Sequence, residues 1–245
     1  MLTALRHRLF RQLRLRGMEI RKAPGGEWEP LSVFRLAVEA LMLRRGAALS
    51  FVQIGANDGV FSDPIRDYIL TRGWHGVLVE PQPDVFERLK GNYPGADGRL
   101  RFEQLAIGPA GTLTLYRPPK GLADDWGLSV VSGDPRVAAR SLKISQDQLE
   151  RIEVPSITLA TLMERHAIDK LDVLQIDVEG LDWQILQTLD FSRLRPTLIQ
   201  IESGQMPRGQ ITEAVHALNG HGYDVYFGGW QGDMLALRRD WLDES

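Results

Sequence analysis

The residues best suited to chemistry collect at the ends of apolar runs in this sequence. The run "FVQI" ends in a turn with two glycines, and a later run, "LDVLQI", ends in two carboxylates, Asp177 and Glu179. Glu80 and Glu202 end two further runs of the same kind. In an open α/β sheet, ligands bind beyond the carboxyl ends of the strands, where the strand order reverses. The sequence therefore predicts one binding site, assembled from the ends of several strands.

The glycine turn and Glu80 together indicate a nucleoside ligand. Glycines at a strand end permit positive φ or a close approach of the ligand to the backbone. Glu80 follows the turn by about 20 residues, and an acid at this spacing accepts hydrogen bonds from the hydroxyls of a ribose. A dinucleotide fingerprint needs further glycines, yet Asn57 and Val60 occupy those positions. An acid within the turn suits a ligand that carries an ammonium group. These features favour S-adenosylmethionine over NAD, with a turn made of Gly55, Ala56, Asn57, Asp58 and Gly59.

The elements that must position these residues alternate along the chain. Hydrophobic periodicity predicts strands at 49–54, 76–80, 101–107, 171–176 and 197–202, and helices at 31–45 and near 64–71, 83–91, 159–166, 181–188 and 210–219. Several strands are apolar nearly throughout, which is typical of a parallel sheet with helices on both faces. The segments "YDVYFGG" and "DMLALR" predict a final antiparallel hairpin.

A long connection between Gly111 and Glu150 interrupts this alternation. Only "TLTLY" within it reads as a strand, and glycines and prolines punctuate the rest. Connections of this length are usually functional or mobile. We predict that Trp126 and Ser129 contact a substrate, because an indole is a suitable platform for the apolar face of a ring. The alternative, that Trp126 only anchors the loop, stays open.

The composition excludes several classes of protein. The chain has 245 residues, of which 43% are hydrophobic and 25% charged, and it has no cysteine. Disulfides and zinc-thiolate sites are therefore excluded, which fits a reducing cytoplasm. No apolar run reaches the roughly 18 residues of a membrane span, and we find no apolar core of a signal peptide. A net charge of -3 argues against a general nucleic-acid binder.

The first 22 residues differ from the rest in being strongly basic. Seven lysines and arginines surround a stripe of leucines there, and Glu19 is the only acid. Such a helix suits a membrane surface or an acidic partner, and the alternative is a solvated helix that docks on the domain. We expect a basic helical extension at 1–45 and one catalytic domain at 46–245, and a homodimer stays open.

At this point the motifs resemble a known family. "FVQIGANDGVFS", "GVLVEPQPDVFERL", "LAIGPAGTLTLY" and "LDVLQIDVEGLDWQIL" look like the FkbM-type S-adenosylmethionine-dependent methyltransferases in order and spacing, from about residue 49 to 238. The resemblance implies a class I methyltransferase, Rossmann-like fold and methylation of a hydroxyl on a sugar, glycan or natural product. This sequence departs from the family at Gln175, where a lysine is frequent, and at Asp58.

The resemblance also implies roles for individual residues. Gly55, Asn57 and Gly59 would form the methionine side of the cofactor pocket, and Glu80 with Pro81 the ribose side. Gln104 to Ala106 would border the adenine. Asp177 and Glu179 would face the reacting centre, and two residues so spaced on an extended strand end share a face. Their alternative role is to cap the helix that follows, since acids favour a helix N-terminus.

The acceptor hydroxyl must also lose its proton, and the sequence leaves two routes open. A general base is one, and a divalent cation such as Mg²⁺, held by Asp177 and Glu202, is the other. Rival candidates for the base are four histidines: His75, His166, His216 and His221. Two further functions also stay open, namely an NAD-dependent dehydrogenase and an inactive methyltransferase-like domain that binds a partner.

Overall fold

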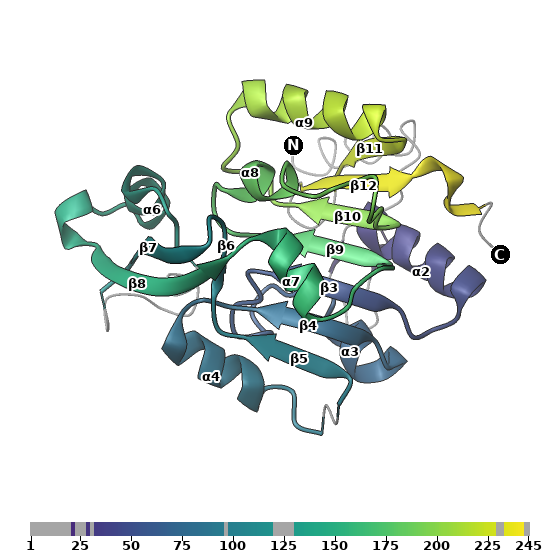
Figure 1. Cartoon of the computed structure of the whole chain (residues 1–245), viewed down its shortest axis with the longest axis horizontal. Helices are drawn as coiled ribbons and strands as arrows, with labels where there is room; N and C mark the ends of the chain where they lie inside the picture. The colour runs from purple at the N-terminus through teal and green to yellow at the C-terminus, as the bar shows by residue number, and fades with distance from the viewer. Residues whose placement is uncertain are drawn as a thin grey trace, which may run out of the picture.

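A central sheet of seven strands organises the chain (Figure 1). The computed structural model describes residues 21–22, 28–29, 32–95, 98–119, 130–228 and 233–242. The strand order is β11-β12-β10-β9-β3-β4-β5. The five strands from β10 to β5 are parallel, whereas β12 and β11 form an antiparallel hairpin at one edge. This topology confirms the predicted mostly parallel sheet and its terminal hairpin.

Apart from β5, which is shorter than predicted, the strands of this sheet match the predicted ones closely. Their bounds are β3 Ser50–Ile54, β4 His75–Val79, β5 Leu100–Glu103, β9 Val173–Ile176, β10 Leu198–Ile201, β11 Tyr223–Phe227 and β12 Met234–Arg238. Every residue of β9 and β10 is buried. Such strands are apolar nearly throughout because helices cover both faces of the sheet.

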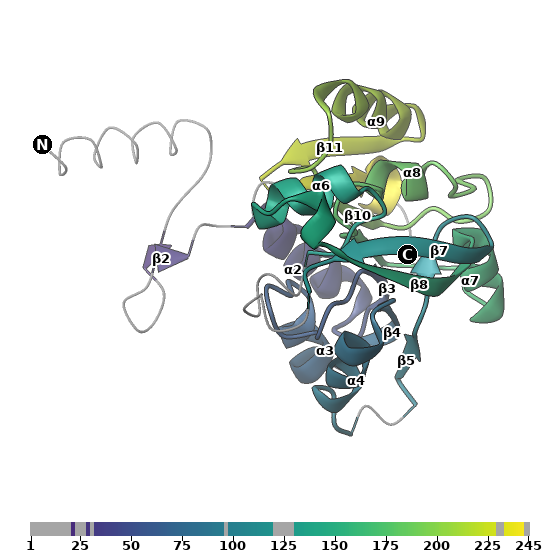
Figure 2. The ribbon, with the colours of Figure 1, turned by 90° about the vertical axis from the view of Figure 1, so that its left-hand side faces the viewer.

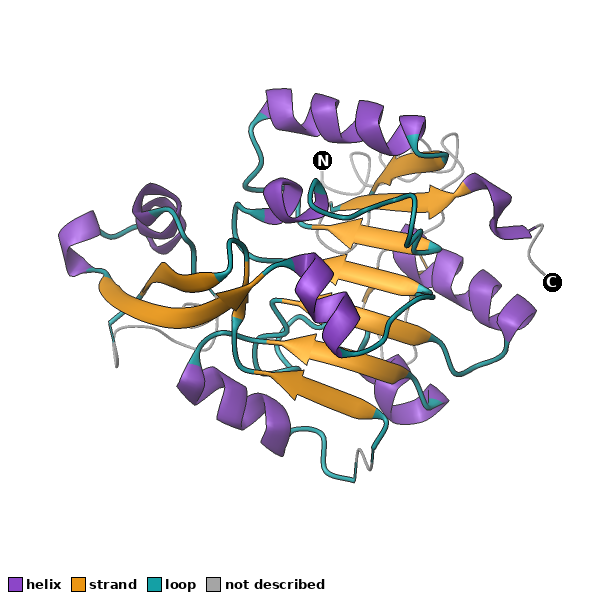
Figure 3. Cartoon of the chain, in the orientation of Figure 1, coloured by secondary structure: helices purple, strands orange, loops and turns teal. Residues whose placement is uncertain are grey.

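Helices cover the two faces in two groups of three (Figure 3). Their bounds are α2 Val33–Arg45, α3 Arg66–Arg72 and α4 Pro83–Gly91 on one face, and α7 Leu159–Arg165, α8 Asp182–Leu186 and α9 Arg208–Gly220 on the other. Leu41 of α2 and Trp74 are fully buried with Phe51 on the first face. None of the described helices is both long and apolar enough to cross a bilayer.

A second, three-stranded sheet stands beyond the carboxyl ends of the parallel strands (Figures 1 and 2). It has the order β6-β8-β7, with bounds β6 Ala106–Ile107, β7 Gly111–Arg117 and β8 Glu150–Ile157, and α6 Pro135–Leu142 lies beside it. The single strand predicted at 101–107 was wrong. The chain stops pairing with β4 after Glu103, and Ala106 and Ile107 pair with β8 instead.

The β8 strand and the α6 helix had no counterpart in the sequence prediction. Residues 150–157 pair with β7 along its whole length, although Pro155 interrupts their sequence pattern. Pro155 has no backbone donor, and it lies outside the two residue pairs that join β8 to β6. Asp134 caps α6 by accepting a hydrogen bond from the Arg136 amide, and Pro135 occupies the first turn. Regular elements therefore make up much of the long connection.

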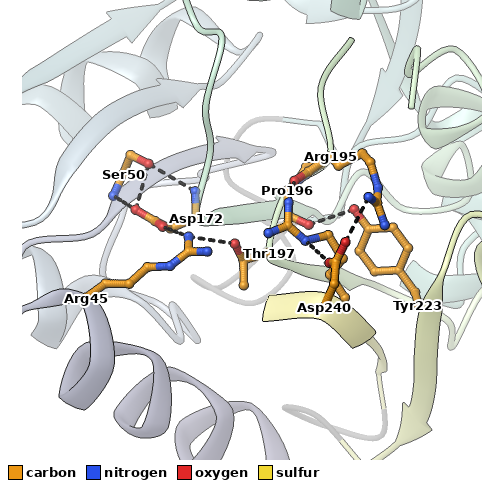
Figure 4. Close-up of polar contacts among 9 residues, drawn as sticks. Arg45, Ser50, Asp172, Arg195, Pro196, Thr197, Tyr223 and Asp240 are labelled. Carbon is orange, nitrogen blue, oxygen red and sulfur yellow. Dashed lines mark hydrogen bonds and ion pairs between the residues drawn. The ribbon is translucent and has the colours of Figure 1, made fainter. Parts of the chain in front are cut away.

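At the amino ends of the strands, a polar network ties three strands to α2 (Figure 4). Asp172 accepts hydrogen bonds from the Ser50 amide at 2.8 Å and from its hydroxyl at 2.9 Å. Arg45 donates to Asp172 at 2.7 Å and to Thr197 at 2.9 Å. Because these residues flank the starts of β3, β9 and β10, the network fixes the register of the strands whose opposite ends carry the predicted site.

The basic segment at 1–22 lies outside the described residues except at its end. Arg21–Lys22 form β1, which pairs antiparallel with β2, Trp28–Glu29, so the segment is extended there rather than helical. The prediction of a helix over 1–22 is therefore wrong at these two residues. The division of the chain at residue 45 stays a prediction, as do the homodimer and the membrane or acidic partner.

Candidate active site

A cavity of about 240 Å³ lies at the carboxyl ends of the parallel strands. Residues that end β3, β4, β9 and β10 line it, and apolar side chains of the second sheet and α8 form its far wall. The strand order reverses here, because β3 lies between β4 and β9. This is the position at which ligands bind in open α/β sheets.

The glycine turn after β3 is shaped by close contact with β9. Gly55 has φ +81°, and a Cβ on it would lie 1.8 Å from the backbone oxygen of Asp177. The amides of Gly55 and Ala56 both donate to the Val79 oxygen, at 3.0 and 2.9 Å. Only glycine fits the first position, so the turn brings backbone, and not a side chain, to the cavity wall.

Glu80 is buried at the edge of the same cavity, with 2% of its surface exposed. One carboxylate oxygen accepts from the Asn57 amide at 3.0 Å, and the other accepts from the Gln82 amide at 2.9 Å. Burial raises the pKa of Glu80 to about 7, although these two amides oppose the shift. The carboxylate thus holds the glycine turn in place and keeps acceptor capacity on each oxygen.

Other predicted cofactor residues divide between the cavity and its surroundings. Ala56, Asn57, Pro81 and Ala106 line the cavity with Gly55 and Glu80. Three lie outside the lining: Asp58, Gly59 and Gln104. Asp58 accepts from the amides of Val60 and Phe61 and so shapes the turn. Gly59 packs against Tyr93, whose ring would lie 2.5 Å from an added Cβ. Gln104 is exposed, and its neighbour Leu105 lines the cavity in its place.

The loop after β9 is organised by an acid that the sequence prediction missed. Asp182 is fully buried, and its two oxygens accept from the amides of Val178 and Gly180, each at 3.0 Å. Glu179 sits between them with φ +55°. The residue that caps α8 is Leu181, and it forms no side-chain cap. Asp177 and Glu179 therefore do not cap this helix, and both line the cavity.

Carboxylates crowd this end of the cavity. Burial raises the pKa of Asp177 to about 6 and of Glu179 to about 7, each with a contribution from a neighbouring acid. Asp177 is nevertheless exposed to solvent where it lines the cavity. Burial, with the charges of four nearby acids, raises the pKa of Glu202 to about 10. Its Oε2 atom is buried and has no hydrogen-bond partner among the described residues.

Three acids of this region also approach the geometry of a cation site. One carboxylate oxygen each from Asp177, Asp182 and Glu202 lie within 4.8 Å of one another. Asp177 and Glu202 are the two metal ligands predicted from the sequence. Hard cations such as Mg²⁺ prefer oxygen ligands of this kind. Asp182 already accepts two backbone hydrogen bonds, so its remaining capacity as a ligand is limited.

Four further residues at the cavity escaped the sequence prediction. Gln53 and Gln175 are buried inside strands, where the periodicity predicts apolar packing. Asp63 follows the glycine turn, and Asp233 precedes β12. The only indication of a site in the sequence was a glutamine within each of two otherwise apolar strands.

The remaining predictions concern the acceptor and the base. Trp126 and Ser129 lie outside the described residues. His75 and His166 border a different hollow at the amino ends of the strands, and His221 stacks on Phe191. Among the described residues, no histidine lines the cavity. The alternative in which one of these four histidines, His216 included, is the general base is therefore wrong.

Comparison with known structures gives distant similarity. A methyltransferase FkbM from Methylobacillus flagellatus KT matches with 12% identity and a TM-score of 0.47, over 82% of this chain and 47% of that one. A METTL16 MTase domain matches with 9% identity and a TM-score of 0.45, over 84% and 66%. A precorrin-6y C5,15-methyltransferase from Geobacter metallireducens GS-15 matches with 12% identity and a TM-score of 0.39, over 83% and 87%. The chain spans about half the length of the first of these proteins.

Comparison with models of protein families gives a more specific result than comparison with solved structures. No curated protein sequence matches the chain significantly. The family model described as the methyltransferase FkbM domain matches residues 53–225, which include the glycine turn, Glu80, Asp177 and Glu202. That range covers more than half of the chain, and the described sheet has the mixed α/β architecture of class I methyltransferases. The chain belongs to the FkbM-domain family of methyltransferases.

Proposed function

We propose that this chain is an S-adenosylmethionine-dependent O-methyltransferase that acts on a hydroxyl of a sugar, glycan or natural product. One observation carries the proposal: the glycine turn, Glu80, Asp177 and Glu179 all line a single cavity. Family membership supports methyl transfer over the dehydrogenase alternative. A location in the cytoplasm is part of the proposal, because the chain has no cysteine.

The residues of the cavity fit the cofactor in three places. Glu80 offers two acceptor oxygens to a ribose diol. Leu105, Ala106 and Ile107 offer an apolar wall to a flat base. The turn at Gly55 presents backbone rather than a side chain to the ligand, because Gly55 lines the cavity. When bound, S-adenosylmethionine supplies a methyl group that is electrophilic because sulfur carries a positive charge.

The acids at the end of β9 serve the acceptor. With the cofactor bound, the acceptor oxygen would take the methyl group, and the electron pair of the broken carbon–sulfur bond would stay on sulfur. The hydroxyl proton passes to Asp177 or Glu179, which line the cavity. Alignment of the reacting atoms can contribute about 7 to 11 kcal/mol to such a step. A divalent cation on Asp177 and Glu202 is our second candidate for acidifying the hydroxyl.

Calorimetry and a transfer assay test this function. We expect tight binding of S-adenosylhomocysteine and none of NAD, followed by transfer of labelled methyl groups to hydroxylated acceptors. Asp177→Asn keeps the shape and removes the charge, so turnover should fall at least about 100-fold with little change in the melting temperature. Normal turnover of this variant would remove Asp177 from the mechanism. Activity that survives EDTA unchanged would remove the cation.

A further inference from the structure

Three buried glutamines form a row across the centre of the sheet. Gln53 of β3, Gln175 of β9 and Gln200 of β10 are partners in register. They are 2%, 4% and 2% exposed. We call them the glutamine row. Residues two apart in a strand share a face, so the row lies on the face that Phe51 and Val173 pack. An apolar residue at each place would continue that packing, so the amides need another explanation.

Two flanking aspartates fix the orientation of the outer amides. The Gln200 Nε2 donates to the Asp233 carboxylate at 3.2 Å, and Gln53 is hydrogen-bonded to the Asp63 carboxylate. Each of these hydrogen bonds lowers the pKa of its aspartate, which is the effect of a donor on a carboxylate. The NH₂ group of each amide must therefore face its aspartate, and the Oε1 atom faces elsewhere.

The oxygens of the row have no donors. In the described part of the chain, the Oε1 atoms of Gln53, Gln175 and Gln200 are buried without a hydrogen-bond partner. Buried polar atoms of native proteins nearly always have a partner, and an unpaired one destabilises the fold. Two of these acceptors, those of Gln53 and Gln175, belong to residues that line the cavity, so they point to a donor from outside the chain.

The cavity wall around the glutamine row also consists largely of acids and hydrogen-bond acceptors. Gln53 and Gln175 line the cavity together with Asp63, Asp177, Glu202 and Asp233. No lysine, arginine or histidine is found in that lining among the described residues. Glu202 adds a further buried oxygen without a partner in the same part of the chain. This end of the cavity thus offers hydrogen-bond acceptors within a cluster of acids, and an added anion would be disfavoured there.

We propose that the glutamine row, with Asp63 and Asp233, forms the acceptor subsite and selects polyhydroxylated acceptors that carry no negative charge. This inference rests on the proposed methyltransferase function. Each hydroxyl of such an acceptor is a donor that an Oε1 atom or a carboxylate can receive. Gln53 and Gln175 bind the acceptor directly, and Gln200 positions Asp233. A uronic acid or a phosphorylated sugar would bring a second anion into the carboxylate cluster.

A charge-matched acceptor screen tests the selectivity. Labelled S-adenosylmethionine is offered with a set of neutral glycosides and polyols, or with the corresponding uronic acids and sugar phosphates. We expect the neutral set to be labelled at least about tenfold faster. Equal or faster labelling of the anionic set would overturn the inference, and so would no labelling of the neutral set by protein that binds S-adenosylhomocysteine. Failure to bind S-adenosylhomocysteine would instead refute the proposed function.

A glutamine variant tests the row itself. Gln175→Met keeps the side-chain size and removes the unpaired oxygen, and Gln187→Met, at the exposed end of α8, is the matched control. We expect the KM for the labelled neutral acceptor to rise about tenfold in Gln175→Met, with an equal or higher melting temperature and the same affinity for S-adenosylhomocysteine. The control should match the wild type. A purely structural role would change the melting temperature and leave KM unchanged, which would overturn the assignment.

Discussion

Glu80 couples the stability of the protein to pH in an unusual direction. Burial raises its pKa from an ordinary 4.5 to about 7 in the folded chain. Between these two values the folded state binds more protons than the unfolded state, so the free energy of unfolding falls as pH rises. The contribution of Glu80 is fully present below about pH 4.5 and is lost above pH 7. Integrated from pH 5 to pH 8, the loss is about 2 to 3 kcal/mol.

Glu80→Gln isolates this contribution, because other acids of the cavity shift in the same direction. We would measure urea unfolding of the wild type and the variant at several pH values from 5 to 8. The difference between the two free energies should change by about 2 to 3 kcal/mol across that range. Glu87→Gln, on the exposed face of the following helix, is the control and should run parallel to the wild type. Parallel curves for Glu80→Gln would refute our reasoning about its burial.

The same substitution should weaken the binding of the cofactor. The amide offers only one acceptor oxygen, and its NH₂ group must face a ribose hydroxyl or one of the backbone amides of Asn57 and Gln82. Hydrogen bonds to a charged group contribute about 1.5 to 3 kcal/mol, so the Kd for S-adenosylhomocysteine should rise at least about tenfold. Calorimetry at pH 8, where the wild-type carboxylate is ionised, gives the clearest comparison. An unchanged Kd would remove Glu80 from the ribose site.

Three further substitutions separate the site from its supports. Gly55→Ala places a Cβ against the Asp177 backbone oxygen, so we expect loss of S-adenosylhomocysteine binding and destabilisation by more than about 3 kcal/mol in urea unfolding. Asp182→Asn turns one acceptor into a donor that faces a backbone amide, so circular dichroism should show a lower melting temperature and the transfer assay a lower turnover. Asp172→Ala removes the network at the opposite end of the strands, so stability should fall by about 2 to 4 kcal/mol. An altered cofactor affinity in refolded Asp172→Ala would contradict its purely structural role.

Much of the fold could be read from local pattern. Apolar residues make up most of the runs "FVQI", "DVLQI" and "TLIQI", because both faces of these strands are covered. The burial of each strand could therefore be predicted from its own residues. The polar residues that follow them meet at one edge because parallel strands point the same way. For this reason Gly55, Glu80, Asp177 and Glu202 could be grouped from the order and direction of their strands.

The tertiary structure alone decided the contacts between segments that are far apart in sequence. No local pattern reports that the chain stops pairing with β4 after Glu103 and then pairs with β8, because the partner strand lies about 50 residues further on. The same holds for the buried hydrogen bonds of Asp182 and for the glutamine row, whose members come from three strands. The sequence by itself determines which side chains stand at the strand ends, since alternation and direction are local properties. Which of them are buried, crowded or without a partner depends on packing, which brings distant residues to the same cavity.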